Sequence, residues 1–280
     1  MNADAVLLSF LFNGSWAALL MLVDRRARQS PFRLAFALAL GMTGAVAVLM
    51  AKTWLDPAQI RPWFVKPWVW RDFFEAGFLE EGVKATLFLI MAWAMRPRDP
   101  LLCFVLACFV GAGFALTENM GYILHGAYQS LAHDPESYYR TIISVAVARS
   151  VPTHSAFTGV VGFALARVLF SRRTMGHWWL VILAFALSVG MHGAWNALGG
   201  AFFLEKYIGV MLVLAFMVWN LKTLSLRLNP SFVSAWERGW IALVPVDCLG
   251  PPVSKKLETL LAAMAAFVYS LLVVNLLTVR

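Results

Sequence analysis

The sequence contains few charged residues and few cysteines, and both shortages exclude classes of protein. Asp, Glu, Lys and Arg make up only 14% of the 280 residues, whereas about a quarter is usual in soluble domains. The three cysteines, Cys103, Cys108 and Cys248, have neither the number nor the spacing of a disulfide framework or a cysteine metal site. Cys103 and Cys108 lie in one apolar run, so we expect them to be small core residues.

The sequence also lacks internal repeats, low-complexity tracts and a recognisable signal peptide. A cleavable signal peptide has a basic stretch before its apolar run. Here Arg25, Arg26 and Arg28 follow the first apolar run instead. This order predicts a first membrane-spanning helix whose N-terminus lies outside.

Apolar residues are abundant and amount to 61% of the chain. Apolar stretches of about 18 residues or more recur along the whole length, and each is long enough to cross a bilayer as a helix. The pattern predicts an all-α fold, in which residues 1–280 form a single integral-membrane domain, a polytopic bundle of about eight transmembrane helices. The predicted spans cover residues 4–23, 32–51, 73–95, 101–125, 141–170, 177–203, 207–225 and 258–278.

The formal net charge of +8 is explained by where the basic residues lie. Of the 23 Lys and Arg residues, fourteen fall in segments predicted on the inner side and seven on the outer side, while Lys84 and Arg149 fall within spans. An inner excess is the positive-inside pattern of membrane proteins. The charge therefore indicates the lipid bilayer as a partner and argues against nucleic-acid binding.

Four predicted spans carry polar residues that hydrocarbon tolerates only when they have partners. Glu80 and Lys84 are four residues apart, on one face of a helix, so we expect them to form an ion pair. The candidate site residues are Glu80, Glu81 and Lys84 in span 73–95, Glu118 in 101–125, Arg149 and His154 in 141–170, and His192 and Asn196 in 177–203.

The polar residues of the four spans are predicted to lie at one depth. With a helical rise of about 1.5 Å per residue, Glu80 lies roughly 10 Å below the outer end of its span. Glu118, His154 and His192 lie roughly 25, 24 and 22 Å above the inner ends of theirs, in a hydrocarbon core about 30 Å thick. The chain reaches this depth alternately from either side, so we expect one shared site in the outer third of the bilayer.

The residue types of this cluster suit the activation of water for hydrolysis. A carboxylate in apolar surroundings can serve as a general acid or base near neutral pH. Imidazole and carboxamide groups can stabilise a tetrahedral oxyanion. The sequence has no Gly-x-Ser-x-Gly motif and no His-Glu-x-x-His motif, so neither a serine nucleophile nor a zincin helix is indicated.

Four segments of the chain resemble the EExxK, FxxxE, His and HxxxN/D motifs of PrsW-type intramembrane proteases. They are Glu80-Glu81-Gly-Val-Lys84, Phe114-Ala-Leu-Thr-Glu118, His154 and His192-Gly-Ala-Trp-Asn196. More distantly, they are similar to the CAAX protease and bacteriocin-processing superfamily, which has His in the position of Glu118 and Arg in the position of Lys84. The resemblance covers about residues 73–200 and makes 73–203 the catalytic core helices.

The resemblance implies an intramembrane endopeptidase that acts in regulated proteolysis. Its substrate would be a single-pass membrane protein such as an anti-sigma factor, cut on its extracytoplasmic side, and its location the bacterial inner (plasma) membrane. Carried over motif by motif, Glu80 would activate water as the general base, with Glu81 and Glu118 in the proton network. Lys84 and Arg149 would balance the charge of the carboxylates.

The remaining motif residues would act on the water and on the substrate carbonyl. The resemblance implies that His154 orients water or polarises the carbonyl, and that His192 and Asn196 donate to the oxyanion. The near balance of fixed charges favours glutamate catalysis without a cofactor. The alternative is a metal-dependent hydrolase with a divalent metal such as zinc, for which Glu80, Glu118, His154 and His192 are a legitimate ligand set.

Three other functions fit parts of the pattern. A proton-coupled transporter uses intramembrane Glu, Lys and His residues, and predicts broken helices and usually an internal repeat. A b-type haem protein would use His154 and His192 as axial ligands, which leaves three carboxylates beside the porphyrin unexplained. A receptor or scaffold without catalysis is the third alternative.

Overall fold

The computed structural model describes residues 31–55, 60–97, 99–133, 135–171, 177–198 and 203–228, together with Leu7, Leu11 and Trp16. Over this part of the chain the regular structure is entirely helical. In chain order the elements are α3 (Pro31–Leu55), α4 (Pro67–Val69), the π-helix η1 (Trp70–Phe78), α5 (Leu79–Met95), α6 (Pro100–His133), the 3₁₀ helix η2 (Pro135–Ser137), α7 (Tyr138–Ala148), α8 (Thr153–Phe170), α9 (Trp179–Ala197) and α10 (Phe203–Leu228).

The described helices confirm the predicted all-α membrane fold. Five segments are long and apolar enough to cross a membrane, namely Pro31–Trp54, Pro100–Ala132, Tyr138–Phe170, Trp179–Ala197 and Leu204–Ser225. The predicted span 73–95 corresponds to η1 and α5, which form one continuous helical rod from Trp70 to Met95. The predicted spans 4–23 and 258–278 lie outside the described residues, apart from Leu7, Leu11 and Trp16, so the count of eight stays a prediction.

The predicted span 141–170 corresponds to the candidate membrane span Tyr138–Phe170, but it is not one unbroken helix, because the chain breaks there into α7 and α8. α7 ends at Ala148 and α8 begins at Thr153. Pro152 has no N–H to donate and disfavours helical geometry at Val151, which explains the break. The Ser150 carbonyl within the break accepts a hydrogen bond from the Trp16 indole. The break has a functional consequence, since it places His154 in the first turn of α8.

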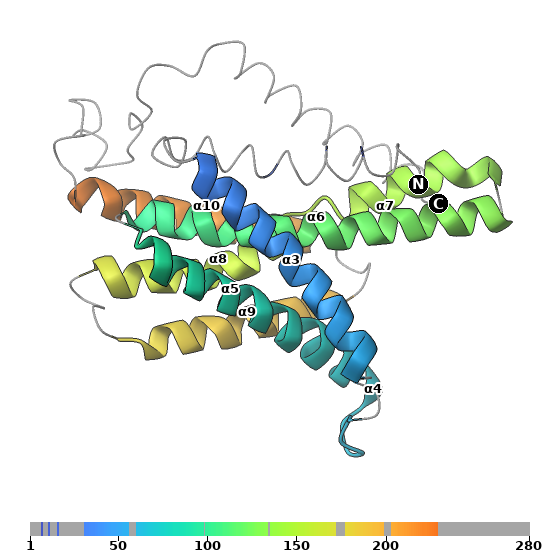
Figure 1. The fold of residues 1–280 in the computed structure, drawn as a ribbon, viewed down its shortest axis with the longest axis horizontal. Helices are drawn as coiled ribbons and strands as arrows, with labels where there is room; N and C mark the ends of the chain where they lie inside the picture. The colour runs from blue at the N-terminus through green and yellow to red at the C-terminus, as the bar shows by residue number, and fades with distance from the viewer. Residues whose placement is uncertain are drawn as a thin grey trace, which may run out of the picture.

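Helix α6 is the centre of the molecule and is longer than predicted. Its 34 residues correspond to roughly 51 Å at about 1.5 Å per residue, more than the hydrocarbon core of about 30 Å. Figure 1 shows α3 crossing α6 diagonally, α8 running alongside α6, α9 lying beyond α8, and the far end of α6 extending past these helices as a hairpin with α7. Residues 101–116 of α6 are all buried.

Glycines let α6 contact its neighbours backbone to backbone. A Cβ added at Gly113 would lie 2.0 Å from the Leu38 carbonyl oxygen on α3, and one added at Gly111 would lie 2.2 Å from the His154 carbonyl oxygen on α8. Small residues commonly permit such close approach in membrane bundles. Cys103 and Cys108 are buried in the same core, as predicted, while Cys248 lies outside the described residues. This close packing of α6 on α8 keeps Glu118 of α6 next to His154 of α8.

Candidate active site

The helical rod formed by η1 and α5 carries the two adjacent glutamates. Its π-helical half packs on α9. There Phe73 contacts Gly193 so closely that a Cβ added to Gly193 would lie 2.3 Å from the Phe73 ring. A Cβ added to Gly77 would likewise lie 2.9 Å from the Val189 carbonyl oxygen. π-Helical turns are rare and often mark functional sites. The contact fixes the start of α5, and therefore Glu80, beside His192 of α9.

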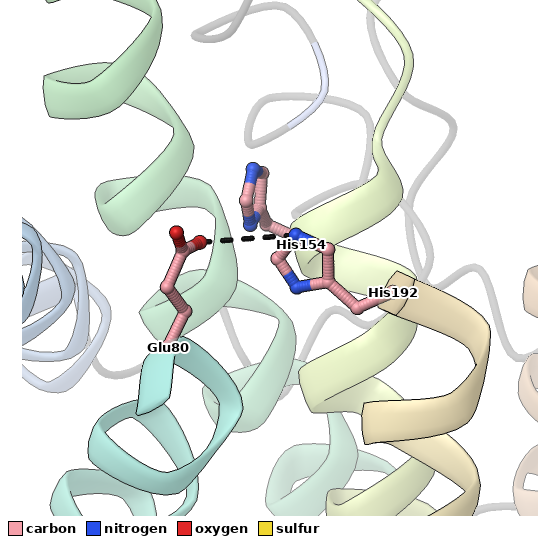
Figure 2. Close-up of side chains that lie close together, drawn as sticks. All are labelled: Glu80, His154 and His192. Atoms are coloured by element: carbon pink, nitrogen blue, oxygen red, sulfur yellow. Dashed lines mark ion pairs between the residues drawn. The ribbon is translucent and has the colours of Figure 1, made fainter. Parts of the chain in front are cut away.

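The four motifs converge at one place, as predicted. Figure 2 shows the side chains of Glu80, His154 and His192 pointing toward one another from α5, α8 and α9. His192 Nε2 lies 3.8 Å from Glu80 Oε2. On the α6 side, His154 Nε2 lies 2.8 Å from Glu118 Oε2. Residues from four helices thus form one cluster of carboxylates and imidazoles.

Glu81 lies behind this cluster, completely buried. Its carboxylate contacts the Lys84 ammonium, the Ser188 hydroxyl at 2.9 Å and His192 Nδ1 at 2.8 Å. Because a carboxylate only accepts, His192 donates its Nδ1 proton to Glu81, which leaves the Nε2 lone pair facing Glu80. Glu81 therefore orients His192 from outside the cavity. Sequence reasoning did not single out Ser188, a lone serine in an apolar helix.

The predicted ion pair between Glu80 and Lys84 is wrong. Lys84 is fully buried, pairs with Glu81, lies 2.9 Å from His154 Nδ1 and sits over the ring of Phe114 at 4.5 Å from its centroid. Glu81 and Lys84 are three residues apart, and Glu80 and Lys84 are four residues apart. Both spacings place the two side chains next to each other on a helix, so helix geometry permits either pair. Tertiary packing selects between the two, because Lys84 faces the α6–α8 core.

Glu80 pairs instead with a lysine from another helix. Lys52 at the end of α3 donates to Glu80 Oε1 at 2.8 Å. The Lys52 side chain is 31% exposed and that of Glu80 only 5%. The second carboxylate oxygen, Glu80 Oε2, is buried without a hydrogen-bond partner in the described part of the chain. One oxygen is thus anchored while the other is available to a ligand.

Arg149 holds Glu118 from the break between α7 and α8. Its guanidinium lies 3.2 Å from Glu118 Oε1 and stacks on the ring of Tyr122 at 3.7 Å from the centroid. Asn119 binds Arg149 twice, accepting from Nε and donating to the backbone oxygen, both at 2.9 Å. Arg149 therefore neutralises Glu118, the role the sequence predicted for it.

The cluster lines a polar cavity of about 410 Å³. Asn196, the last motif residue, lies on its wall, whereas Glu81 and Lys84 do not reach it. Sequence reasoning missed several wall residues, because all but Trp195 lie outside the four motifs and Trp195 is not one of the polar positions of its motif. These are Lys52, Arg71, Asp72, Glu75, Ala76, Tyr122, Thr153 and Trp195.

Three residues of the cavity fit a metal ion. Glu80, His154 and His192 each offer a ligand atom, and the three atoms lie within 4.8 Å of one another. Two histidines and one glutamate are an established ligand set of catalytic zinc, which keeps a further position for water. The available Glu80 Oε2 and the oriented His192 Nε2 support the fit. Glu118, predicted as a fourth ligand, lies outside this group and instead contacts His154 and Arg149.

The fold and the site together define a polytopic helical membrane protein with a hydrolase-type Glu–His cluster buried among its helices. A family model described as "PrsW family intramembrane metalloprotease" matches residues 29–221, well over half of the chain. The protein belongs to this family of intramembrane proteases. Comparison with curated proteins and with solved structures gave no match. The family implies a membrane-embedded protein substrate and a bilayer environment.

Proposed function

We propose that the protein is a metal-dependent intramembrane endopeptidase that cuts a single-pass membrane protein, such as an anti-sigma factor, near the extracytoplasmic face of the bacterial inner membrane. The observation that carries the proposal is the grouping of Glu80, His154 and His192 in a cavity that also contains Glu118. The family description supports it. The positive-inside distribution supports an outward-facing N-terminus and site.

Glu80, His154 and His192 are the residues that would hold the metal. When bound, a divalent ion such as zinc supplies Lewis-acid activation of water and of the substrate carbonyl. Glu81 keeps the proton of His192 on Nδ1, so that Nε2 stays available. This two-residue arrangement, a carboxylate behind a ligand histidine, sets the orientation and basicity of the imidazole.

Glu118 is placed to handle protons. Its Oε2 lies 2.8 Å from His154 Nε2, and its side chain is partly exposed to the cavity. We assign it the transfer of a proton from the attacking water to the leaving amine, with Arg149 fixing its position. Asn196, which lines the same cavity, is assigned as a donor to the carbonyl oxygen as it becomes negative, which carboxamides do in other hydrolases.

We expect metal removal to lower proteolysis at least tenfold. Catalytic zinc generates a nucleophile from water that the protein groups alone cannot generate as well. Purified protein in proteoliposomes would be assayed on candidate single-pass substrates, before and after dialysis against a chelator and after addition of Zn²⁺. Equilibrium dialysis of Zn²⁺ with the detergent-solubilised protein should give about one bound ion, a value lost in the His154→Ala/His192→Ala variant.

A second result would reverse the choice of mechanism. Full activity in chelator, together with no bound Zn²⁺, would contradict the metal-dependent mechanism. Catalysis would then return to the glutamate mechanism that the charge balance favoured, with Glu80 as the general base.

We expect Lys52→Met to lower activity and Zn²⁺ affinity by roughly 10- to 100-fold, the usual loss when a group that holds a metal ligand is removed. Lys52 fixes one oxygen of Glu80, and without it the carboxylate can rotate. Lys52→Arg also donates and should recover much of both values. Lys66, an exposed residue of the same outer segment, supplies the control Lys66→Met. An equal loss in the Met and Arg variants would show that Lys52 does not act through Glu80.

The transporter alternative gains one observation from the structure. The chain breaks between α7 and α8 beside the cluster, as the transporter hypothesis predicted. The break is explained by Pro152, and the chain belongs to a protease family. We therefore keep the protease as the proposed function.

A further inference from the structure

Helices α3 and α6 approach each other most closely where they cross and separate beyond the crossing. At the crossing, a Cβ added to Gly41 would lie 2.0 Å from the Val110 carbonyl oxygen, and one added to Gly113 would lie 2.0 Å from that of Leu38. Two straight helices that cross at an angle diverge with distance from the crossing. Figure 1 shows the crossing and the divergence of α3 toward its C-terminal end.

The divergence leaves a groove of about 350 Å³, which we call the α3–α6 groove. Phe114 lies at its narrow end, packed with Ala45 and Val48. Val46 and Leu49 form an outward rim, 47% and 66% exposed. The groove is lined by Ala45, Val46, Val48, Leu49 and Lys52 of α3, by Phe114, Thr117, Glu118, Gly121, Tyr122 and His125 of α6, and by Glu80.

The groove ends at the candidate active site. Four residues, Lys52, Glu80, Glu118 and Tyr122, line both the α3–α6 groove and the polar cavity. The apolar path from the rim at Leu49 therefore leads to the two carboxylates. A ligand that lay in the groove with one end at Lys52 would present that end to Glu80 and Glu118.

The chemistry of hydrolysis selects the form of the ligand. In an α-helix each inner peptide carbonyl accepts a hydrogen bond from the N–H four residues further on, and the side chains surround the backbone. An extended peptide is thinner and leaves its carbonyls free of the helical hydrogen bonds that would shield them from attack. The walls of Ala, Val, Leu and Phe side chains suit small or branched apolar residues.

We propose that the α3–α6 groove binds the substrate as an unwound, extended apolar segment at the outer end of its membrane-spanning helix. The segment passes over the rim at Leu49 from the lipid and delivers its peptide bond to Glu80 and Glu118. The proposal rests on the proposed protease function and adds the route and the conformation of the substrate. It assigns Gly121, which lies in the groove wall on α6, a role in specificity.

Gly121 offers a direct test, because nothing lies within 4 Å of a Cβ added there. Gly121→Phe should fill the groove without disturbing helix packing. Gly209 on α10 is equally open, so Gly209→Phe is the matched control. Two quenched-fluorescence probes would be compared in proteoliposomes: a synthetic peptide with an apolar span of about 20 residues and a short water-soluble peptide carrying the same cleavable region.

We expect Gly121→Phe to cut the spanning peptide at least tenfold more slowly than wild type. Cleavage of the soluble peptide, which has no apolar segment to lie in the groove, should slow far less, while Gly209→Phe behaves as wild type on both. If the Gly121→Phe variant cut the spanning peptide at the wild-type rate, the α3–α6 groove would not be the substrate-binding site. An equal loss of rate on both peptides would also contradict the proposal, since it would place the effect in the catalytic cavity.

A binding measurement separates failure of the groove from failure of the proposed function. A photo-cross-linking amino acid would replace Leu49 on the rim, or Leu212, an exposed residue of α10, in the His192→Ala variant. Capture of the spanning peptide at position 49 and not at 212 supports the groove even if no peptide is cut. Capture of lipid alone at position 49, or an internal cross-link to residues 1–30 or 229–280, would show another occupant and overturn the proposal.

Discussion

Replacing Glu80 by glutamine is expected to reduce proteolysis by roughly 10²- to 10⁴-fold, the usual contribution of a group that handles the proton or the nucleophile in the transition state. Glu80 Oε2 faces His192 Nε2 at 3.8 Å and has no hydrogen-bond partner within the described helices. Glutamine keeps the volume and removes the charge. The loss is expected in both mechanisms, because Glu80 is a ligand in one and the general base in the other.

The test of Glu80→Gln compares rates on the spanning peptide with bound Zn²⁺. Loss of both activity and Zn²⁺ supports the ligand role, whereas loss of activity with Zn²⁺ retained supports the general-base role. Glu205, an exposed residue in the first turn of α10, supplies the control Glu205→Gln, expected to match wild type. A Glu80→Gln variant within twofold of wild type would remove Glu80 from the site.

Replacing Lys84 by methionine is expected to destabilise the protein by about 3–5 kcal/mol, the usual cost of removing one partner of a buried ion pair. Lys84 is 0% exposed, and its ammonium contacts Glu81 and His154. Methionine fills similar space but leaves the Glu81 carboxylate buried without its cation. Unfolding in mixed micelles by titration with SDS would measure the loss, with Lys222→Met on α10 as the control.

The double variant Glu81→Gln/Lys84→Met separates charge burial from packing. The introduced glutamine is neutral, and its carboxamide oxygen can still accept from His192 Nδ1. We therefore expect most of the stability to return, as when both partners of a buried pair are replaced. A double variant as unstable as Lys84→Met would show that Lys84 stabilises the core by packing on Phe114 and not by pairing with Glu81.

The positions of the helices could largely be predicted from the sequence. Apolar runs gave the approximate location of every long described helix, because burial in hydrocarbon imposes a length and a composition that are visible without a structure. The break at Arg149–Pro152 was missed, although Pro152 carried the signal. The π-helix over Trp70–Phe78 had no such signal, and it lies where Phe73 packs tightly on Gly193 of α9.

The sequence by itself determined the class of fold and the residues that meet at the site. Ionisable groups within apolar spans have to find one another, and counting the helical rise placed Glu80, Glu118, His154 and His192 at one depth. Their ion pairs were decided only by the tertiary structure. Spacing allowed Lys84 to pair with either glutamate, and the crossing of α3 over α6 brought Lys52 to Glu80 and opened the α3–α6 groove beside it. Partners on different helices depend on crossing angles and contact points, which local periodicity does not encode.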